Sequence, residues 1–320
     1  MASPNTTFTE LVTTTFRKHK KEIKDNISNR NAVLKYIMRQ GNYVHEDGGL
    51  TIATPLDYQS NNTYQRYSDW DTLNISASDV ISSAEYQWRQ IAINVVASGR
   101  ELKINSGSSK IMDLAKSRMK NAIRTFNNNF SSDLYSSGSL SNQINGLQAI
   151  VADTNTNTVG GIDASAWAFW QNTVVSATAL SVTPSATTIE GSLMLPTWLA
   201  VDRGAGDQPN LIVADNTYYQ FFENSQVSLK RYAEKESVNA GFASIKYKSA
   251  DVTYDGNSGC PSQHMYFLNT EYLKLVVHKD ADLSELPEQR PTNQDGVVIP
   301  ILWMGNLICS NRKQQAVIKA

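Results

Sequence analysis

The sequence predicts a chain of the α+β class, in which strands and helices are partly segregated along the chain. Two observations predict it. Apolar side chains recur every three to four residues over 108–135, which is the spacing of an amphipathic helix. Short runs rich in β-branched and aromatic residues, separated by turn residues, fill 43–99 and most of 240–320. We see no internal repeat in the sequence and no linker long enough to separate independent domains.

Bulk composition limits the classes of protein that fit. The 320 residues carry a formal net charge of −1, so bulk charge gives no reason to expect a nucleic-acid or membrane partner. The longest apolar runs, such as 297–304, are too short to span a bilayer. The N-terminus lacks a basic region followed by an apolar one, so we expect no signal peptide. Cys260 and Cys309 are too few for a disulfide framework and are expected to be free thiols in a reducing cytosol.

Residues 7–40 are predicted to be helical, with a second short helix over 30–39 that stops at Gly41. The first part carries a basic stretch. A solvated helix face is the simpler interpretation of this stretch, and an arm that touches nucleic acid or an acidic neighbour is the alternative. The basic residues are Arg17, Lys18, Lys20, Lys21 and Lys24.

Residues 84–98 can form one long strand. Its first half is polar on one face, whereas its second half places Ile91, Ile93 and Val95 on one face. This pattern indicates a hairpin that projects from the body and is rooted in the core. Because an isolated hairpin is marginally stable in water, we expect it to lie on a partner surface, with packing against its own subunit as the alternative. The expected contact residues are Tyr64, Arg66, Tyr67, Trp70 and Trp88.

The remaining elements are predicted in order along the chain. The helix over 108–135 begins near Ser108, and its apolar stripe is expected to be core. Asp215 is expected to cap a helix that carries Tyr218, Phe221 and Phe222. We further predict a loop over 181–188, a helix over 189–201, a buried strand over 211–214, a meander over 240–278, and closing strands over 297–311 and 314–320.

A search for catalytic motifs finds no nucleophile elbow, phosphate loop, dinucleotide fingerprint or zinc-protease helix in the sequence. Cys260 and His264 are four residues apart, but the sequence offers no second pair at ligand spacing, so no metal site is predicted. Asp280 and Asp282 fit a solvated loop. The sequence therefore predicts a protein that is not an enzyme and has no cofactor.

Six segments occur in a distinctive order along the chain. They are GGLTIATPL, YQRYSDWDTL, AEYQWRQ, INGLQAIVAD, TVGGIDASAWAFWQN and LIVADNTYYQFFE. This order resembles the major capsid proteins of tailed bacteriophages with the HK97-like fold, over nearly the whole chain. The segment from GLQAIV to the Trp-rich end is the most specific part, and 280–320 contribute little to the resemblance.

The resemblance implies an architecture and a function. The chain would assemble into pentamers and hexamers of a virion capsid, in the host bacterial cytoplasm, and would enclose double-stranded DNA without sequence-specific binding. Scaffolding, portal and decoration proteins would be further partners, with no membrane and no cofactor. The implied segments are an N-terminal arm over 1–42, an E-loop with flanking strands over 43–99, a peripheral (P) domain over 100–182 with its spine helix at about 108–135, an axial (A) domain over 183–270, and strands over 271–320 that return to the P-domain.

The same resemblance suggests roles for the segment 146–172. Gly160 and Gly161 would let the backbone turn where a side chain would clash, and Asp163 would hold the following turn. Trp167, Phe169 and Trp170 would pack beside the spine helix or under the E-loop of a neighbouring subunit.

Three other interpretations are open at this point. An encapsulin-like compartment shell shares the fold and packages enzyme cargo. A cytosolic enzyme with an unrecognised α+β fold would run as a small oligomer. A surface adhesin would agree with the Ser/Thr/Asn content, but the absence of an evident signal peptide argues against it.

Overall fold

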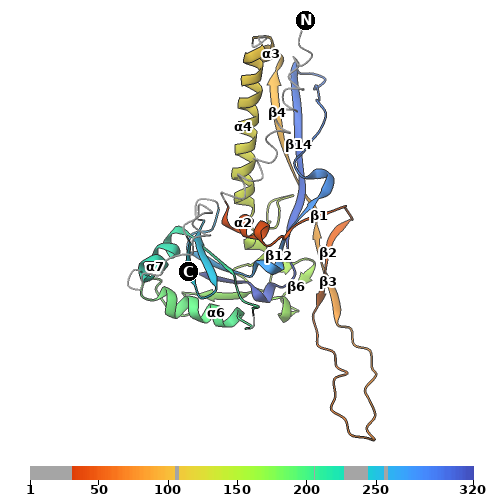
Figure 1. The fold of residues 1–320 in the computed structure, drawn as a ribbon, viewed down its shortest axis with the longest axis vertical. Helices are drawn as coiled ribbons and strands as arrows, with labels where there is room; N and C mark the ends of the chain where they lie inside the picture. The colour runs from red at the N-terminus through yellow and green to blue at the C-terminus, as the bar shows by residue number, and fades with distance from the viewer. Residues whose placement is uncertain (1–30, 105–107, 205, 227–243, 256–258) are drawn as a thin grey trace.

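The structure is a computed structural model that describes residues 31–104, 108–204, 206–226, 244–255 and 259–320 (Figure 1). The predicted basic stretch at 17–24 lies outside the described residues. Among the helices that are described, each is too short or too polar to cross a membrane.

The first described element is the short helix α2 (Ala32–Arg39). The side chain of Asn31 caps it by accepting a hydrogen bond from the backbone N–H of Leu34 at 3.0 Å. The helix is followed by Gly41, whose φ of +74° suits glycine. One face of α2 is buried, which confirms the predicted second helix.

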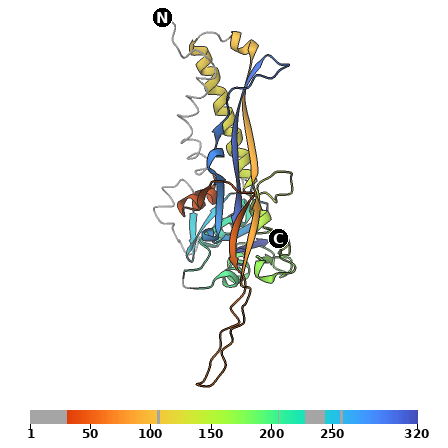
Figure 2. The ribbon, with the colours of Figure 1, turned by 90° about the vertical axis from the view of Figure 1, so that its right-hand side faces the viewer.

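A five-stranded sheet and helix α4 (Ser108–Asp133) form the long body of the molecule (Figures 1 and 2). The whole of β4 pairs antiparallel with β14, and α4 lies beside these two strands. Phe130 of α4 packs edge-on against Trp303, with ring centroids 5.1 Å apart. The predicted amphipathic helix is confirmed. The strands are β1 (Tyr43–Glu46), β12 (Leu273–His278), β14 (Gly296–Cys309), β13 (Ser284–Glu285) and β4 (Arg89–Ser98), with helix α3 (Gly99–Ile104) following β4.

A second, six-stranded sheet is buried on both faces. One face packs against helices α6 and α7, and the other joins the core that includes α2 and the end of α4. Burial on both faces explains the continuous apolar run Leu-Ile-Val-Ala in β8. In spatial order the strands are β7 (Thr173–Ser176), β15 (Ala316–Lys319), β11 (His264–Leu268), β8 (Leu211–Ala214), β10 (Ala250–Tyr254) and β9 (Ser244–Tyr247).

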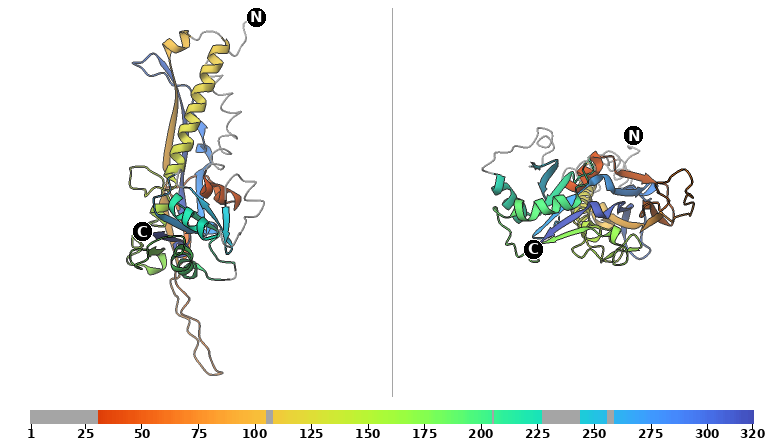
Figure 3. Two further views of the ribbon diagram at one scale, coloured as in Figure 1. Left: turned by 90° about the vertical axis from the view of Figure 1, so that its left-hand side faces the viewer. Right: turned by 90° about the horizontal axis from the view of Figure 1, so that it is seen from below.

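The helices over the second sheet follow the prediction. A π-helical turn, η2 (Ile189–Met194), continues into α6 (Leu195–Val201). Helix α7 (Asn216–Gln226) is capped by Asp215, whose Oδ1 accepts from the N–H of Tyr218 at 2.9 Å. Seen from below in Figure 3, this helical layer and the β2–β3 hairpin lie on opposite sides of the molecule.

Two predictions about strand order are wrong. The segment 240–278 is not a meander, because β10 pairs with β8 in parallel and β12 belongs to the five-stranded sheet. The closing strands likewise separate, β14 into one sheet and β15 into the other. Because the six-stranded sheet draws strands from three of the predicted segments, the segment boundaries stay a prediction.

The predicted single strand over 84–98 is interrupted at Trp88, where the chain changes its pairing partner. Before that residue, β3 (Ile81–Gln87) pairs with β2 (Thr51–Asp57), and after it β4 pairs with β14. The hairpin of β2 and β3 projects from the body in the direction opposite to α4 (Figures 1 and 2). The remaining short elements are α5 (Leu147–Ile150), β5 (Thr158–Val159), β6 (Ile162–Asp163), η1 (Ala168–Trp170), η3 (Thr270–Tyr272), η4 (Lys279–Ala281) and η5 (Arg312–Gln314).

Candidate interaction surface

The root of the projecting hairpin is held by its own small core. Alternate residues of β2 and β3 face inward, as expected for strands with one buried face. Their apolar side chains meet residues from the loop around β5 and β6 and from β12 and β14. The members of this core are Ile52, Leu56, Ala84, Tyr86, Val159, Ala164, Trp170, Val276 and Ile308.

Gly160 and Gly161 form the turn between β5 and β6, with φ values of +60° and +75°. Such values suit a two-residue hairpin turn. The turn lies directly on β3, because the backbone oxygen of Gly160 accepts from the N–H of Glu85 at 2.9 Å. A Cβ at position 160 would be 2.9 Å from the Cβ of Ala84, whereas a Cβ at position 161 would meet open space.

Asp163 holds the turn that follows. Its Oδ1 accepts a hydrogen bond from the N–H of Ser165 at 2.8 Å. Hydrogen bonds from Ser165 hold the pKa of the Asp163 carboxyl below its usual value. The carboxylate is therefore committed to its own loop.

Trp170 is a core residue, so its prediction as an intersubunit contact is wrong. Its side chain is 1% exposed, and its Nε1 donates to the backbone oxygen of Val159 at 2.9 Å. It packs against the root of the hairpin of its own chain rather than beside the spine helix. Trp167 is 50% exposed and is available to a partner.

Arg312, which sequence reasoning did not predict as a functional or structural residue, joins several segments of this region through hydrogen bonds. Its buried guanidinium donates to the backbone oxygens of Ile150 at 2.8 Å and Trp170 at 3.0 Å. It also donates to Oδ1 of Asn157 at 2.7 Å and Oδ1 of Asn172 at 3.1 Å. Burial lowers the pKa of Arg312. A single arginine in a polar segment near the C-terminus carries no signal from which sequence reasoning could find this role.

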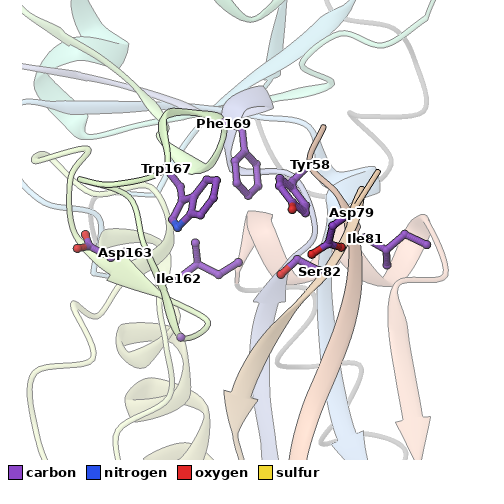
Figure 4. Close-up of a pocket in the computed structure, with 9 residues that line it drawn as sticks. Tyr58, Asp79, Ile81, Ser82, Ile162, Asp163, Trp167 and Phe169 are labelled. Carbon is purple, nitrogen blue, oxygen red and sulfur yellow. The ribbon is translucent and has the colours of Figure 1, made fainter. Parts of the chain in front are cut away.

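A hollow of about 340 Å³ lies between the root of the hairpin and the loop that carries Trp167 (Figure 4). We call it the root hollow. Three aromatic rings line it and contact one another, with centroid separations of 5.7 Å for Tyr58–Trp167, 5.7 Å for Tyr58–Phe169 and 6.1 Å for Trp167–Phe169. The full lining is Tyr58, Asp79, Ile81, Ser82, Gly161, Ile162, Asp163, Trp167 and Phe169.

The side chains of the root hollow have distinct orientations in Figure 4. Trp167 and Ile162 come from one wall, Tyr58 and Ser82 from the other, and Phe169 lies between them. Asp79 lies beside Tyr58, whereas the carboxylate of Asp163 points away. The hollow therefore combines aromatic surface with one carboxylate at its edge, which suits a positively charged side chain. Tyr58 and Asp79 were not predicted, because they lie far from Trp167 in the sequence.

The outer part of the hairpin exposes large apolar side chains. Tyr64 is 81% exposed, Tyr67 is 69% and Trp70 is 98%. Arg66 is also exposed. The alternative that the hairpin packs back on its own subunit is thus not what the structure has. Exposed apolar side chains gathered in this way are typical of interaction surfaces.

The loop between the strands has hydrogen bonds of its own. Strand pairing ends where the N–H of Tyr58 donates to the oxygen of Val80 at 3.1 Å. Farther out, Nε2 of Gln65 donates to the oxygen of Thr72 at 3.0 Å, and Oε1 of Gln65 accepts from the N–H of Asn74 at 3.0 Å. These bonds keep the two sides of the loop together beyond the strands.

Trp88 lies at the strand break and is partly buried. Its Nε1 donates to the oxygen of Gly49 at 3.0 Å, and its ring meets that of His278 edge-on at 5.6 Å. Trp88 therefore stabilises the base of the hairpin within the subunit, and only part of it remains for a neighbour.

Among the cysteines and histidines that the structure describes, none gathers with others into a candidate metal centre. Cys260 and Cys309 are buried free thiols, and burial raises the pKa of both. His264 has its Nε2 2.9 Å from Oδ2 of Asp153. Across the described ranges, no group of three or more potential metal ligands comes together.

Comparison with known proteins identifies the fold. No protein-family model matches the sequence, and no curated protein matches it significantly. Solved structures do match. A chain of the cyanophage A-1(L) capsid asymmetric unit is 15% identical, with a TM-score of 0.68 over 88% of this chain and 91% of that chain.

Two further solved structures match over a similar share of this chain. The capsid of Myoviridae phage XM1 is 10% identical, with a TM-score of 0.54 over 89% of this chain and 91% of that chain. The holo-SrpI encapsulin of Synechococcus elongatus PCC 7942 is 10% identical, with a TM-score of 0.55 over 89% and 86%. The chain therefore has the HK97-like capsid fold.

Proposed function

We propose that this chain is the major capsid protein of a tailed bacteriophage, a structural subunit that closes into an icosahedral shell around double-stranded DNA. The observation that carries the proposal is the match to the cyanophage A-1(L) capsid chain over about nine-tenths of both chains. The exposed aromatic side chains of the hairpin support it, because a surface of this kind needs a partner.

In this proposal each segment has an assembly role. Residues 1–42 are the N-terminal arm, and 43–99 are the E-loop with its flanking strands. Residues 100–182 belong to the P-domain with α4 as its spine, 183–270 to the A-domain, and 271–320 return to the P-domain. Pentamers and hexamers repeat the same contacts many times, so modest individual contacts add up to a stable shell.

The shell acts without turnover and without a cofactor. Scaffolding, portal and decoration proteins are its proposed partners besides further copies of itself. The DNA is enclosed without sequence-specific contacts, and the basic stretch at 17–24 faces it. Neutralising Lys18, Lys20 and Lys21 together is expected to reduce packaged DNA and to leave empty shells intact, and unchanged DNA content would refute this role.

An encapsulin-like compartment is the second candidate, because the SrpI encapsulin matches over 89% of this chain. Both candidates predict a closed shell. They differ in what the shell encloses, which is DNA in the first case and a protein cargo in the second.

The proposal is tested by expressing the chain alone and examining it by negative-stain electron microscopy and size-exclusion chromatography. Shells, tubes or capsomer rings are expected. A chain that stays a small oligomer, even when it is co-expressed with the neighbouring genes of its own genome, would refute the proposal and favour a cytosolic enzyme.

A further inference from the structure

The hairpin is acidic and carries a single cation near its tip. Between residues 51 and 87, Arg66 is the only basic residue. It is exposed and stands among the exposed rings of Tyr64, Tyr67 and Trp70. The acidic residues of the same segment are Asp57, Asp69, Asp71, Asp79 and Glu85. A partner surface for the tip therefore needs to accept aromatic rings and one guanidinium.

The root hollow offers the complementary chemistry. Its walls are the rings of Tyr58, Trp167 and Phe169, on which a planar guanidinium stacks favourably. The exposed carboxylate of Asp79 lies at its edge, in reach of a bidentate hydrogen bond to an arginine placed there. The apolar side chain of Ile162 adds surface for the methylene stem of such an arginine.

We propose that the root hollow of one subunit binds Arg66 from the hairpin tip of a second copy of this chain. The inference rests on the proposed shell function and names the contact that the hairpin makes within it. Arg66 cannot reach the hollow of its own chain. It lies eight residues beyond Tyr58, a span of roughly 26 Å along an extended loop, and the hairpin points away from the body.

The contact joins two different surfaces of the chain. A tip that binds the root of the next copy is a heterologous contact, which gives a ring where the rotation between copies closes and an open filament where it does not; the proposed pentamers and hexamers require the first. One wall of the hollow is the hairpin root itself, and the other is the loop that carries Trp167. An arginine bound between these walls would fix the direction of the hairpin of the subunit that receives it. That hairpin would then already point toward the hollow of the following copy.

Disulfide trapping tests the contact directly. The native thiols Cys260 and Cys309 are buried, so new surface cysteines are the reactive ones. In the double variant Arg66→Cys, Asp79→Cys, assembled particles under mild oxidation are expected to give a ladder of covalent oligomers on a non-reducing gel. The matched control is Arg66→Cys with Arg290→Cys, whose second site is exposed on a different segment, and it should give no ladder.

Charge exchange provides the second test. Arg66→Glu and Asp79→Arg each replace an exposed side chain, so both variants should fold normally, as checked by circular dichroism. Each is expected to lower the assembled fraction by about tenfold or more, and combining the two should restore it.

The outcomes separate the two proposals. If the wild-type chain forms shells, but the variant Arg66→Cys, Asp79→Cys gives no ladder and Arg66→Glu assembles like the wild type, the tip-to-root contact is overturned and the capsid function stands. A ladder that appears equally with Arg290→Cys would also overturn it. A wild-type chain that forms no particle under any condition refutes the shell function itself.

Discussion

The hydroxyl group of Tyr86 makes two hydrogen bonds to the backbone of Cys309: it donates to the oxygen at 2.9 Å and accepts from the N–H at 3.3 Å. Tyr86 lies at the root of the projecting hairpin, and Cys309 ends the central strand β14. Both residues are buried. These hydrogen bonds therefore connect the hairpin to the five-stranded sheet, although the two residues are far apart in the sequence.

Replacing Tyr86 with phenylalanine should destabilise the subunit by about 1–3 kcal/mol, because it removes both hydrogen bonds inside a buried site. The free energy of unfolding is measured from urea titrations of the unassembled chain. Tyr64→Phe, which removes the same hydroxyl group from an exposed position, is the control and should change stability by less than about 0.5 kcal/mol. Equal effects of the two substitutions would contradict the role of the Tyr86 hydroxyl.

Gly160 and Gly161 provide a matched pair of substitutions. Both have positive φ, so alanine at either position should cost about 1–2 kcal/mol of backbone strain. Only at position 160 would the new methyl group also press on Ala84 and the ring of Tyr86. We therefore expect Gly160→Ala to cost a further ~1–3 kcal/mol of overpacking, measured by the same urea titrations. If Gly161→Ala lowered the free energy of unfolding more than Gly160→Ala, the close packing of Gly160 on β3 would be contradicted.

Sequence reasoning succeeded where the signal is local. The apolar stripe of α4, the cap at Asp215 and the buried run of β8 each depend on residues close together in the chain. It failed where pairing is non-local. The sequence predicts Trp88 to lie in the middle of one strand. It does not show that the pairing partner of the chain changes from β2 to β14 at that residue.

The candidate site shows the same division. The segment around the hairpin tip is rich in aromatic and turn residues, which predicts the exposed aromatic side chains. The pair of glycines at 160 and 161 predicts the turn. The root hollow was not predicted, since Tyr58 and Phe169 meet only through the folding of two distant segments. For Trp170 the sequence leaves open both packing within the subunit and contact with a neighbour, because a tryptophan in a polar loop fits a core residue and an anchor equally well, and only its burial decides between them.

Alkaline pH should destabilise the subunit. Burial raises the pKa of Cys309 to about 12 and also raises the pKa of Tyr218 and of Tyr247 to about 12. In the unfolded chain these groups lose their protons near pH 8.5 for cysteine and pH 10 for tyrosine, about two or more units earlier. The neutral forms are thus favoured by folding, and stability is full below the unfolded values and falls as the pH rises toward 12.

The measurement is the urea midpoint of the unassembled chain at pH 7.5, 9.5 and 11. We expect a progressive fall over this range. In a parallel check, a thiol reagent at pH 9 should leave both cysteines of the folded chain unmodified and should label both in urea. A midpoint that stays constant to pH 11 would show that the burial of these groups does not control alkaline stability.

Trp167 and Trp170 should separate assembly from folding, although they lie three residues apart. Trp170 is buried and bonded to Val159, so Trp170→Ala should destabilise the subunit by about 3–5 kcal/mol. Trp167 is half exposed at the root hollow, so Trp167→Ala should change the free energy of unfolding by no more than about 1 kcal/mol. It removes an aromatic wall of the hollow, however, and should lower the assembled fraction by about tenfold or more. Urea titration and particle yield by size-exclusion chromatography measure the two effects independently. If the Trp167→Ala variant assembles like the wild type, the root hollow takes no part in the assembly contact. If it is destabilised as much as Trp170→Ala, Trp167 acts as a core residue.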